Sequence, residues 1–183
     1  MKKYNFIIEG NILKEYASVN GDIIIPDSVE VIGEQAFYKC ENITSIAIPH
    51  NVKVIEAAAF AQCKNLISVF LPEGLTKIEQ RTFYGCQNLT SITIPESVTQ
   101  IDYLAFGSCY NLKSVIILEG VKQIGDMAFE CCANLTDMFI PNSVTDIVGH
   151  RVFMGCPNII IHTPKGSYGE NYAKENNLQV VLV

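Results

Sequence analysis

Short apolar segments that alternate with polar positions recur along the chain and predict β-strands. In Ser91–Ile94, which reads SITI, successive side chains point to opposite faces, as they do in a half-buried strand. Pro95 lacks the backbone donor that a strand ladder needs, and it ends the segment. Equivalent segments predict one short parallel strand per repeat, near residues 23, 46, 69, 92, 115 and 138.

These segments belong to an internal repeat of 23 residues, with one interval of 24. Phenylalanine marks the repeat, and cysteine follows it three residues later every time. The two columns are Phe37, Phe60, Phe83, Phe106, Phe129 and Phe153, and Cys40, Cys63, Cys86, Cys109, Cys132 and Cys156. The single insertion lies near Val148 to His150. A unit of this length cannot enclose a core alone, so the repeats must stack.

The segment that follows each strand is expected to return around the far side of the coil. In ESVTQIDYLAFGSC, residues 96–109, we expect Val98, Ile101, Ala105 and Phe106 to point inward. That far side is predicted to be convex and to consist of turns or short 3₁₀ pieces.

Both ends of the repeat array carry specialised segments. YNFIIEGNILKEY predicts a hairpin with Gly10 and Asn11 at its turn, which would cover the first repeat. Ser167 and Glu170 have the spacing of a capping box and predict a short helix, with Tyr168 and Tyr172 on one face. LQVVLV, residues 178–183, then predicts a last strand that closes the sheet edge.

The repeat unit resembles the 23-residue leucine-rich repeat of the BspA-like family, through its IP, SV, IG and AF..C landmarks over Ile23 to Pro164. Glu56, Glu79 and Asp102 replace the glycine of IG, and Leu118 replaces a proline. The resemblance implies a mainly β solenoid of the α/β type, a right-handed leucine-rich-repeat horseshoe with a parallel concave sheet. We expect a single domain over residues 1–183, with an N-terminal hairpin cap (1–22), repeats (23–164) and a C-terminal helix–strand cap (165–183).

Composition agrees with one compact domain and limits the classes of partner. The chain has 183 residues, of which 49% are hydrophobic and 17% charged. Its net charge of -6 argues against a nucleic-acid surface, which needs clustered Lys and Arg. No signal peptide and no membrane span are visible, so the chain as it stands is expected to be cytoplasmic. The family resemblance implies the alternative, a cell-surface or secreted protein of bacterial adhesion and host contact.

The seven cysteines are interpreted as packing residues. Neighbouring strands lie about 4.8 Å apart, which would permit disulfides, but equivalent side chains on stacked repeats point the same way. Cysteine is also among the most frequently buried small apolar residues. We therefore expect the six column thiols to be reduced and buried, and Cys131, which lies off the column, to be an exposed turn thiol.

The sequons at Asn42, Asn88 and Asn134 are interpreted as part of the repeat. Asn65 and Asn111 occupy the same column without a following Ser or Thr. The asparagine is therefore expected to hydrogen-bond backbone groups of the turn rather than to carry a glycan.

Catalytic, cofactor-binding and metal-binding residues are not predicted. His50, His150 and His162 fall in different repeats, too far apart to share one metal ion. His162 could lie diagonal to Asp137 near a recurring serine column, but no strained nucleophile turn or Gly-rich oxyanion loop accompanies these residues. The sequence predicts no enzyme and no cofactor.

One column suggests a binding surface. The outward strand positions on the concave side are apolar at most repeats, and they are Ile24, Ala47, Phe70, Thr93, Ile116, Phe139 and His162. The position after the proline is mostly acidic and should line one rim, with Glu73, Glu96 and Glu119 at its centre. Strand propensity alone could explain the apolar residues. We favour a partner site formed by Phe70, Thr93, Ile116, Phe139 and these three glutamates.

The function expected from this surface is that of a non-enzymatic protein-binding module whose partner has a basic surface. The alternative is binding of a glycan or cell-wall polymer along the same groove, because aromatic residues serve both kinds of ligand.

Overall fold

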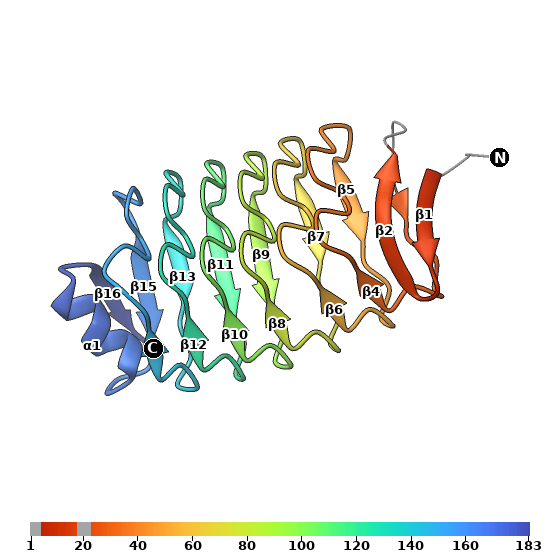
Figure 1. Ribbon diagram of the computed structural model, residues 1–183. Coiled ribbons are helices and arrows are strands. Elements are labelled where there is room, and N and C mark those ends of the chain that lie inside the picture. The colour runs from red at the N-terminus through yellow and green to blue at the C-terminus, as the bar shows by residue number, and fades with distance from the viewer. Residues whose placement is uncertain (1–4, 18–22) are drawn as a thin grey trace.

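The computed structural model describes residues 5–17 and 23–183, which form a solenoid of stacked repeats (Figure 1). Each repeat contributes one strand to a main parallel sheet. These strands are β3 (Ile23–Ile24), β5 (Ser45–Ala47), β7 (Ser68–Phe70), β9 (Ser91–Ile94), β11 (Ser114–Ile117), β13 (Asp137–Phe139) and β15 (Ile160–Thr163). The first six fall at the predicted positions, β15 continues the series, and every pair among them is parallel.

A second parallel sheet, which the sequence analysis did not predict, follows the proline corner of each repeat. Its short strands are β4 (Val31–Ile32), β6 (Val54–Ile55), β8 (Lys77–Ile78), β10 (Gln100–Ile101), β12 (Gln123–Ile124) and β14 (Asp146–Ile147). Two residues are too few to show an alternating pattern, so these strands are recognisable only from their pairing. The far wall of the coil consists of turns, as expected.

The phenylalanine column forms the centre of the core. Its rings stack one above another, 4.9 to 5.9 Å apart and within 12° of parallel. Phe37, Phe60, Phe83, Phe106 and Phe129 are fully buried. The insertion before Phe153 coincides with the widest of these ring separations.

The N-terminal cap is the predicted hairpin of β1 (Asn5–Glu9) and β2 (Ile12–Ala17), with Gly10 in the left-handed region at the turn. Tyr16 from β2 packs its ring 5.3 Å from that of Phe37 and so begins the aromatic stack. β2 also pairs in parallel with β4 and thereby extends the second sheet. Residues 1–4 and 18–22 of the predicted cap lie outside the described residues.

The C-terminal cap is the helix α1 (Tyr168–Glu175) and the strand β16 (Gln179–Leu182), which pairs in parallel with β15. Ser167 caps the helix and accepts a hydrogen bond from the amide of Glu170, as predicted. The Glu170 carboxylate accepts from the amide of Gly166. Tyr168 and Tyr172 do not share an environment, because Tyr172 is buried against Phe153 whereas Tyr168 is exposed.

Candidate functional site

The outward column of the main sheet is largely apolar in the structure. We call the surface that it lies on, turned away from the core, the open face. Ile24, Phe70 and Ile116 expose 69%, 76% and 47% of their surface, Phe139 is half-buried and Thr93 is exposed. Strand register places Ile116 between Thr93 and Phe139. The structure therefore brings these three predicted site residues together in one row.

Phe70 lies apart from that row in the hydrogen-bonding pattern. Strand register pairs it with Ala47, and no strand ladder joins β7 to β9 within the described chain. A hollow of about 300 Å³ lies between these strands, and Phe70 and Thr93 both line it. The predicted strip of side chains is thus carried by two separate pieces of sheet.

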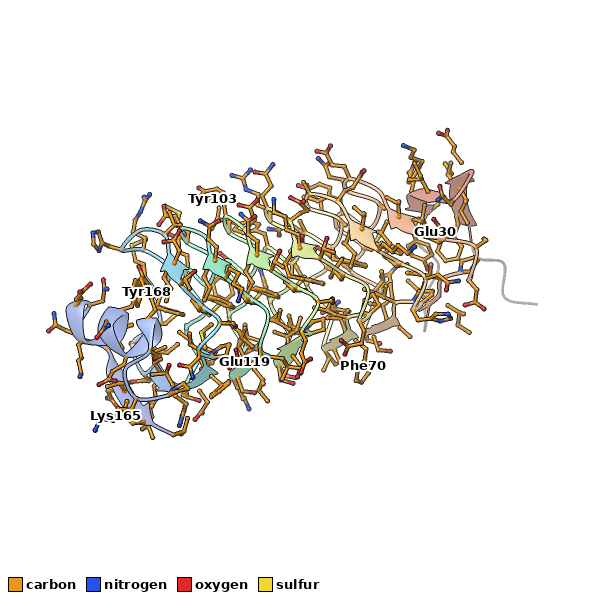
Figure 2. All side chains as sticks on the ribbon, turned by 90° about the horizontal axis from the view of Figure 1, so that it is seen from below. Glu30, Phe70, Tyr103, Glu119, Lys165 and Tyr168 are labelled. Carbon is orange, nitrogen blue, oxygen red and sulfur yellow. The ribbon has the colours of Figure 1, made fainter. Side chains whose placement is uncertain are left out.

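The predicted acidic rim is present. Glu73, Glu96 and Glu119 are all exposed, and Figure 2 shows Glu119 on the same edge of the molecule as Phe70, opposite Tyr103. Glu119 also has a structural contact, since its carboxylate accepts a hydrogen bond from the amide of Ser143 at 3.0 Å. Glu73 and Glu96 form no ion pair with any described residue, so their charges are directed to solvent.

A glycine keeps this rim compact. Gly120 has a φ of 146°, and a Cβ on it would lie 1.9 Å from the carbonyl oxygen of Glu96. Two backbone segments of neighbouring repeats therefore meet directly between Glu96 and Glu119. A larger residue at this position would push the two acidic corners apart.

At the C-terminal end of the open face, His162 lies beside Asp137, as anticipated, with Nε2 and Oδ1 3.3 Å apart. Ser114 is the register partner of Asp137 on the adjacent strand. Phe139 is flanked by Ile116 and His162, so the apolar row ends at an ionisable pair. Among residues 5–17 and 23–183, no three His, Cys, Asp or Glu side chains are grouped closely enough to hold a metal ion.

The column cysteines belong to the core. All six are buried free thiols, and five donate to the carbonyl oxygen of the phenylalanine in the preceding repeat at 3.0 to 3.2 Å. Burial raises the pKa of the Cys40 thiol to about 11 and that of Cys109 to about 12. Such thiols stay protonated and unreactive at neutral pH. Cys131 is half-buried, so the prediction of an exposed thiol at this position was only partly right.

The asparagine column forms a side-chain ladder. Asn88 donates to the side-chain oxygen of Asn65, Asn111 donates to Asn88, and Asn134 donates to Asn111. Asn65 and Asn134 also donate to backbone carbonyls of the preceding repeat, which was the predicted contact. The ladder itself was not foreseen, because it requires side chains of successive repeats to pair with one another.

A second hollow, on the turn wall, was not predicted from the sequence. It has a volume of about 280 Å³, and its lining includes Tyr38, Ala58, Ala61, Arg81 and Tyr84. Most other repeats carry larger residues at the positions of these alanines, although Gly107 occupies the position of Ala61, and the alanines leave space between the two tyrosines. The sequence EAAAFAQ was the signal that could have revealed it.

Comparisons with known proteins agree with the repeat and the fold. The model of the BspA type leucine rich repeat region matches residues 8–106 and 30–160, with six copies. No curated protein matches the chain as a relative. Within the described residues, no helix has both the length and the apolar character needed to cross a membrane.

Three solved structures illustrate the likeness. The pneumococcal vaccine antigen PcpA is 19% identical with a TM-score of 0.80, over 97% of this chain and 45% of its own. A leucine rich cell surface protein from Faecalibacterium prausnitzii A2-165 is 26% identical with a TM-score of 0.65, over 94% and 41%. The leucine rich repeat protein TpLRR of T. pallidum is 23% identical with a TM-score of 0.69, over 99% and 95%.

This chain therefore spans less than half the length of the first two proteins. The shared period, the parallel solenoid and the family match together establish that the chain belongs to the BspA-type leucine-rich repeat family.

Proposed function

We propose that the chain is a non-enzymatic protein-binding module whose open face receives a protein with a basic surface. The observation that carries this proposal is the coincidence of an exposed apolar row with an acidic rim in which Glu73 and Glu96 form no ion pair within the described chain. Exposed apolar patches of a few hundred Å² on soluble proteins mark interaction sites.

Phe70 is the principal anchor in this proposal. It is the most exposed large hydrophobic residue of the described chain, and an aromatic side chain can bury roughly 150 to 250 Å² in a contact. Ile116 and the half-buried Phe139 add a smaller apolar area along the same row. The partner would therefore bury an aromatic anchor at one end and a shallower apolar row beyond it.

The acidic rim makes the open face selective for partners with a basic surface. Glu73 and Glu96 attract a basic partner and repel an acidic one, because their carboxylates are exposed and form no ion pair with a described residue. The net charge of -6 acts in the same direction at longer range. Association should accordingly slow as salt is added.

Site-directed crosslinking tests this function. A photo-reactive benzoylphenylalanine at position 70 should crosslink one protein of the native extract, while the same group at position 38 on the turn wall should not. Tyr38 is a matched control because it is an exposed aromatic residue on another surface. The crosslinked protein is then purified and titrated against the chain. Equal crosslinking from both positions, or a crosslinked glycan instead of a protein, would overturn the proposal.

The compartment belongs to the same proposal. Cytoplasmic placement stays a prediction. Placement at the cell surface draws support from the Faecalibacterium neighbour, which is described as a cell surface protein. Protease treatment of intact cells separates the two placements, because only a surface-displayed chain is cleaved.

A further inference from the structure

Each sheet of the solenoid is interrupted once among the described strands, at neighbouring junctions. No ladder joins β6 to β8 in the second sheet or β7 to β9 in the main sheet, whereas the other consecutive strands of each sheet are paired. At the other junctions of the second sheet, bonds such as Glu56 N to Ile32 O and Asp102 N to Ile78 O close the ladder. The equivalent bond between the described residues Glu79 and Ile55 is not made. We call the interruption between β7 and β9 in the main sheet the seam.

The seam is confined to the main sheet. The same two repeats are joined in the second sheet by the ladder of β8 and β10, and on the turn wall by backbone bonds from Arg81 to Tyr103, from Phe83 to Ala105 and from Gly85 to Gly107, at 2.8 to 3.0 Å. The rings of Phe83 and Phe106 are stacked 5.4 Å apart. The amide of Thr90 also donates to the carbonyl of Ile67 at 3.2 Å, so only the ladder between β7 and β9 themselves is missing.

A hollow of about 300 Å³ lies at this interruption on the open face. The hollow lies at the small end of the volumes of roughly 300 to 1,000 Å³ that ligand pockets have, so it suits one side chain rather than a larger ligand. Its polar lining consists of the hydroxyls of Ser68, Ser91 and Thr93 and the carboxylate of Glu73. Phe70 supplies the aromatic wall.

None of these polar side chains has a hydrogen bond or ion pair to another described residue. The lysine of the same repeat does not neutralise Glu73, because Lys77 is paired with Glu79 at 3.0 Å and with Asp102 at 2.9 Å. The hollow thus combines an uncompensated negative charge, free acceptors and an exposed aromatic face.

The charge, the hydroxyls and the aromatic wall of the hollow indicate which chemical group it can bind. An anion would be repelled by Glu73 and by Glu96 on the next corner, and an apolar group would leave the carboxylate and hydroxyls without partners once water is excluded. A guanidinium is planar, stacks on an aromatic face and donates to carboxylates and hydroxyls together. We propose that the seam hollow receives an arginine side chain of the partner protein, stacked on Phe70 and paired with Glu73.

This inference rests on the proposed function and adds the residue type of the partner, arginine, that the open face would bind. It is tested with a defined probe, acetyl-glycyl-arginyl-glycinamide, titrated into the ¹⁵N-labelled chain. The control probe is the citrulline analogue, which has nearly the same shape and no charge. The arginine peptide should shift the amides around Phe70, Glu73, Ser91 and Thr93 saturably, and the citrulline peptide should bind about tenfold more weakly.

Two variants test whether the arginine peptide binds at the hollow. Glu73→Gln should weaken arginine-peptide binding by about tenfold, whereas the matched Glu119→Gln, on the same rim and away from the hollow, should leave it unchanged. Equal binding of the two peptides, or equal losses in the two variants, would overturn the inference. If the peptide does not bind at the hollow while the open-face double variant Phe70→Ser/Phe139→Ser still loses the protein partner, only this inference is wrong. If that double variant keeps the partner, the proposed function itself falls, whatever the peptide does.

Discussion

The ring of Tyr172 meets that of Phe153 edge-on, 6.2 Å away and at 69°, whereas the five ring contacts along the phenylalanine column are stacked. The Tyr172 hydroxyl donates to the carbonyl of Gly149 at 3.3 Å. The helix α1 thus ends the core with an aromatic residue that covers the last phenylalanine and satisfies a carbonyl in the inserted loop.

This contact predicts how much the cap contributes to stability. Tyr172→Ala should lower the free energy of unfolding by about 3 to 5 kcal/mol, because it leaves a cavity beside Phe153. Tyr172→Phe keeps the ring and should lower it by only about 1 kcal/mol, the size of one hydrogen bond. Urea denaturation of the two variants measures the difference, and equal losses would contradict the capping role.

Stability should fall in alkaline solution. Burial raises the pKa of Cys40 to about 11 and of Cys109 to about 12, from 9.0, and burial with Asp126 nearby raises that of Tyr172 to about 12, from 10.0. Because the folded state favours the protonated groups, their contribution is complete below about pH 9 and is lost as pH rises toward 12. The urea midpoint should therefore be flat from pH 7 to 8.5 and decline above it, less steeply in Cys109→Ala. A midpoint independent of pH up to 11 would contradict this expectation.

Cys131 and the column cysteines should differ in their reactivity toward a thiol reagent. Cys131 is half-buried in a turn, whereas the column thiols are buried. A thiol reagent at neutral pH should therefore modify at most one cysteine in the native chain and all seven after unfolding. Cys131→Ser should abolish the native reaction. Rapid modification of several thiols in the folded protein would show that the column is not closed to solvent.

Gly120 should be intolerant of substitution. A Cβ would lie 1.9 Å from the Glu96 carbonyl oxygen, and the φ of 146° disfavours any other residue. Gly120→Ala should destabilise the protein by about 3 kcal/mol or more. Gly166→Ala is the matched control, since its φ of 78° is strained too but nothing lies within 4 Å, and we expect about 1 kcal/mol there. Similar losses at both sites would argue against direct backbone contact at the rim.

Periodicity was sufficient to place the main sheet and the core. A residue that recurs every 23 positions occupies the same place in each turn, so the burial of Phe83 or Cys86 follows from the spacing. Tyr16 could not be found in this way, because it enters the aromatic stack from a hairpin outside the repeat. Tyr172 was placed on the correct helix, but only the docking of that helix decides which tyrosine is buried.

The residues of the candidate site could be predicted from the sequence, but the interruption of the sheet beneath them could not. The outward column and its acidic rim follow from strand alternation and the position of the proline, and Phe70 and Glu73 are where the pattern indicated. The seam was not predictable, because a regular repeat implies that all junctions are alike. Whether two neighbouring strands form a ladder depends on small differences in backbone geometry, which residue types do not reveal.

Binding of the protein partner by the open face is measured most directly by titration. The purified crosslinked partner should be titrated against the wild-type chain, the Phe70→Ser/Phe139→Ser double variant and the control Tyr38→Ser, with thermal unfolding measured for each. We predict that the double variant keeps its melting temperature to within a few degrees and raises the Kd by about 30-fold or more, as loss of an anchor worth about 2 kcal/mol requires. Tyr38→Ser should bind like wild type. An unchanged Kd in a folded double variant would contradict the account.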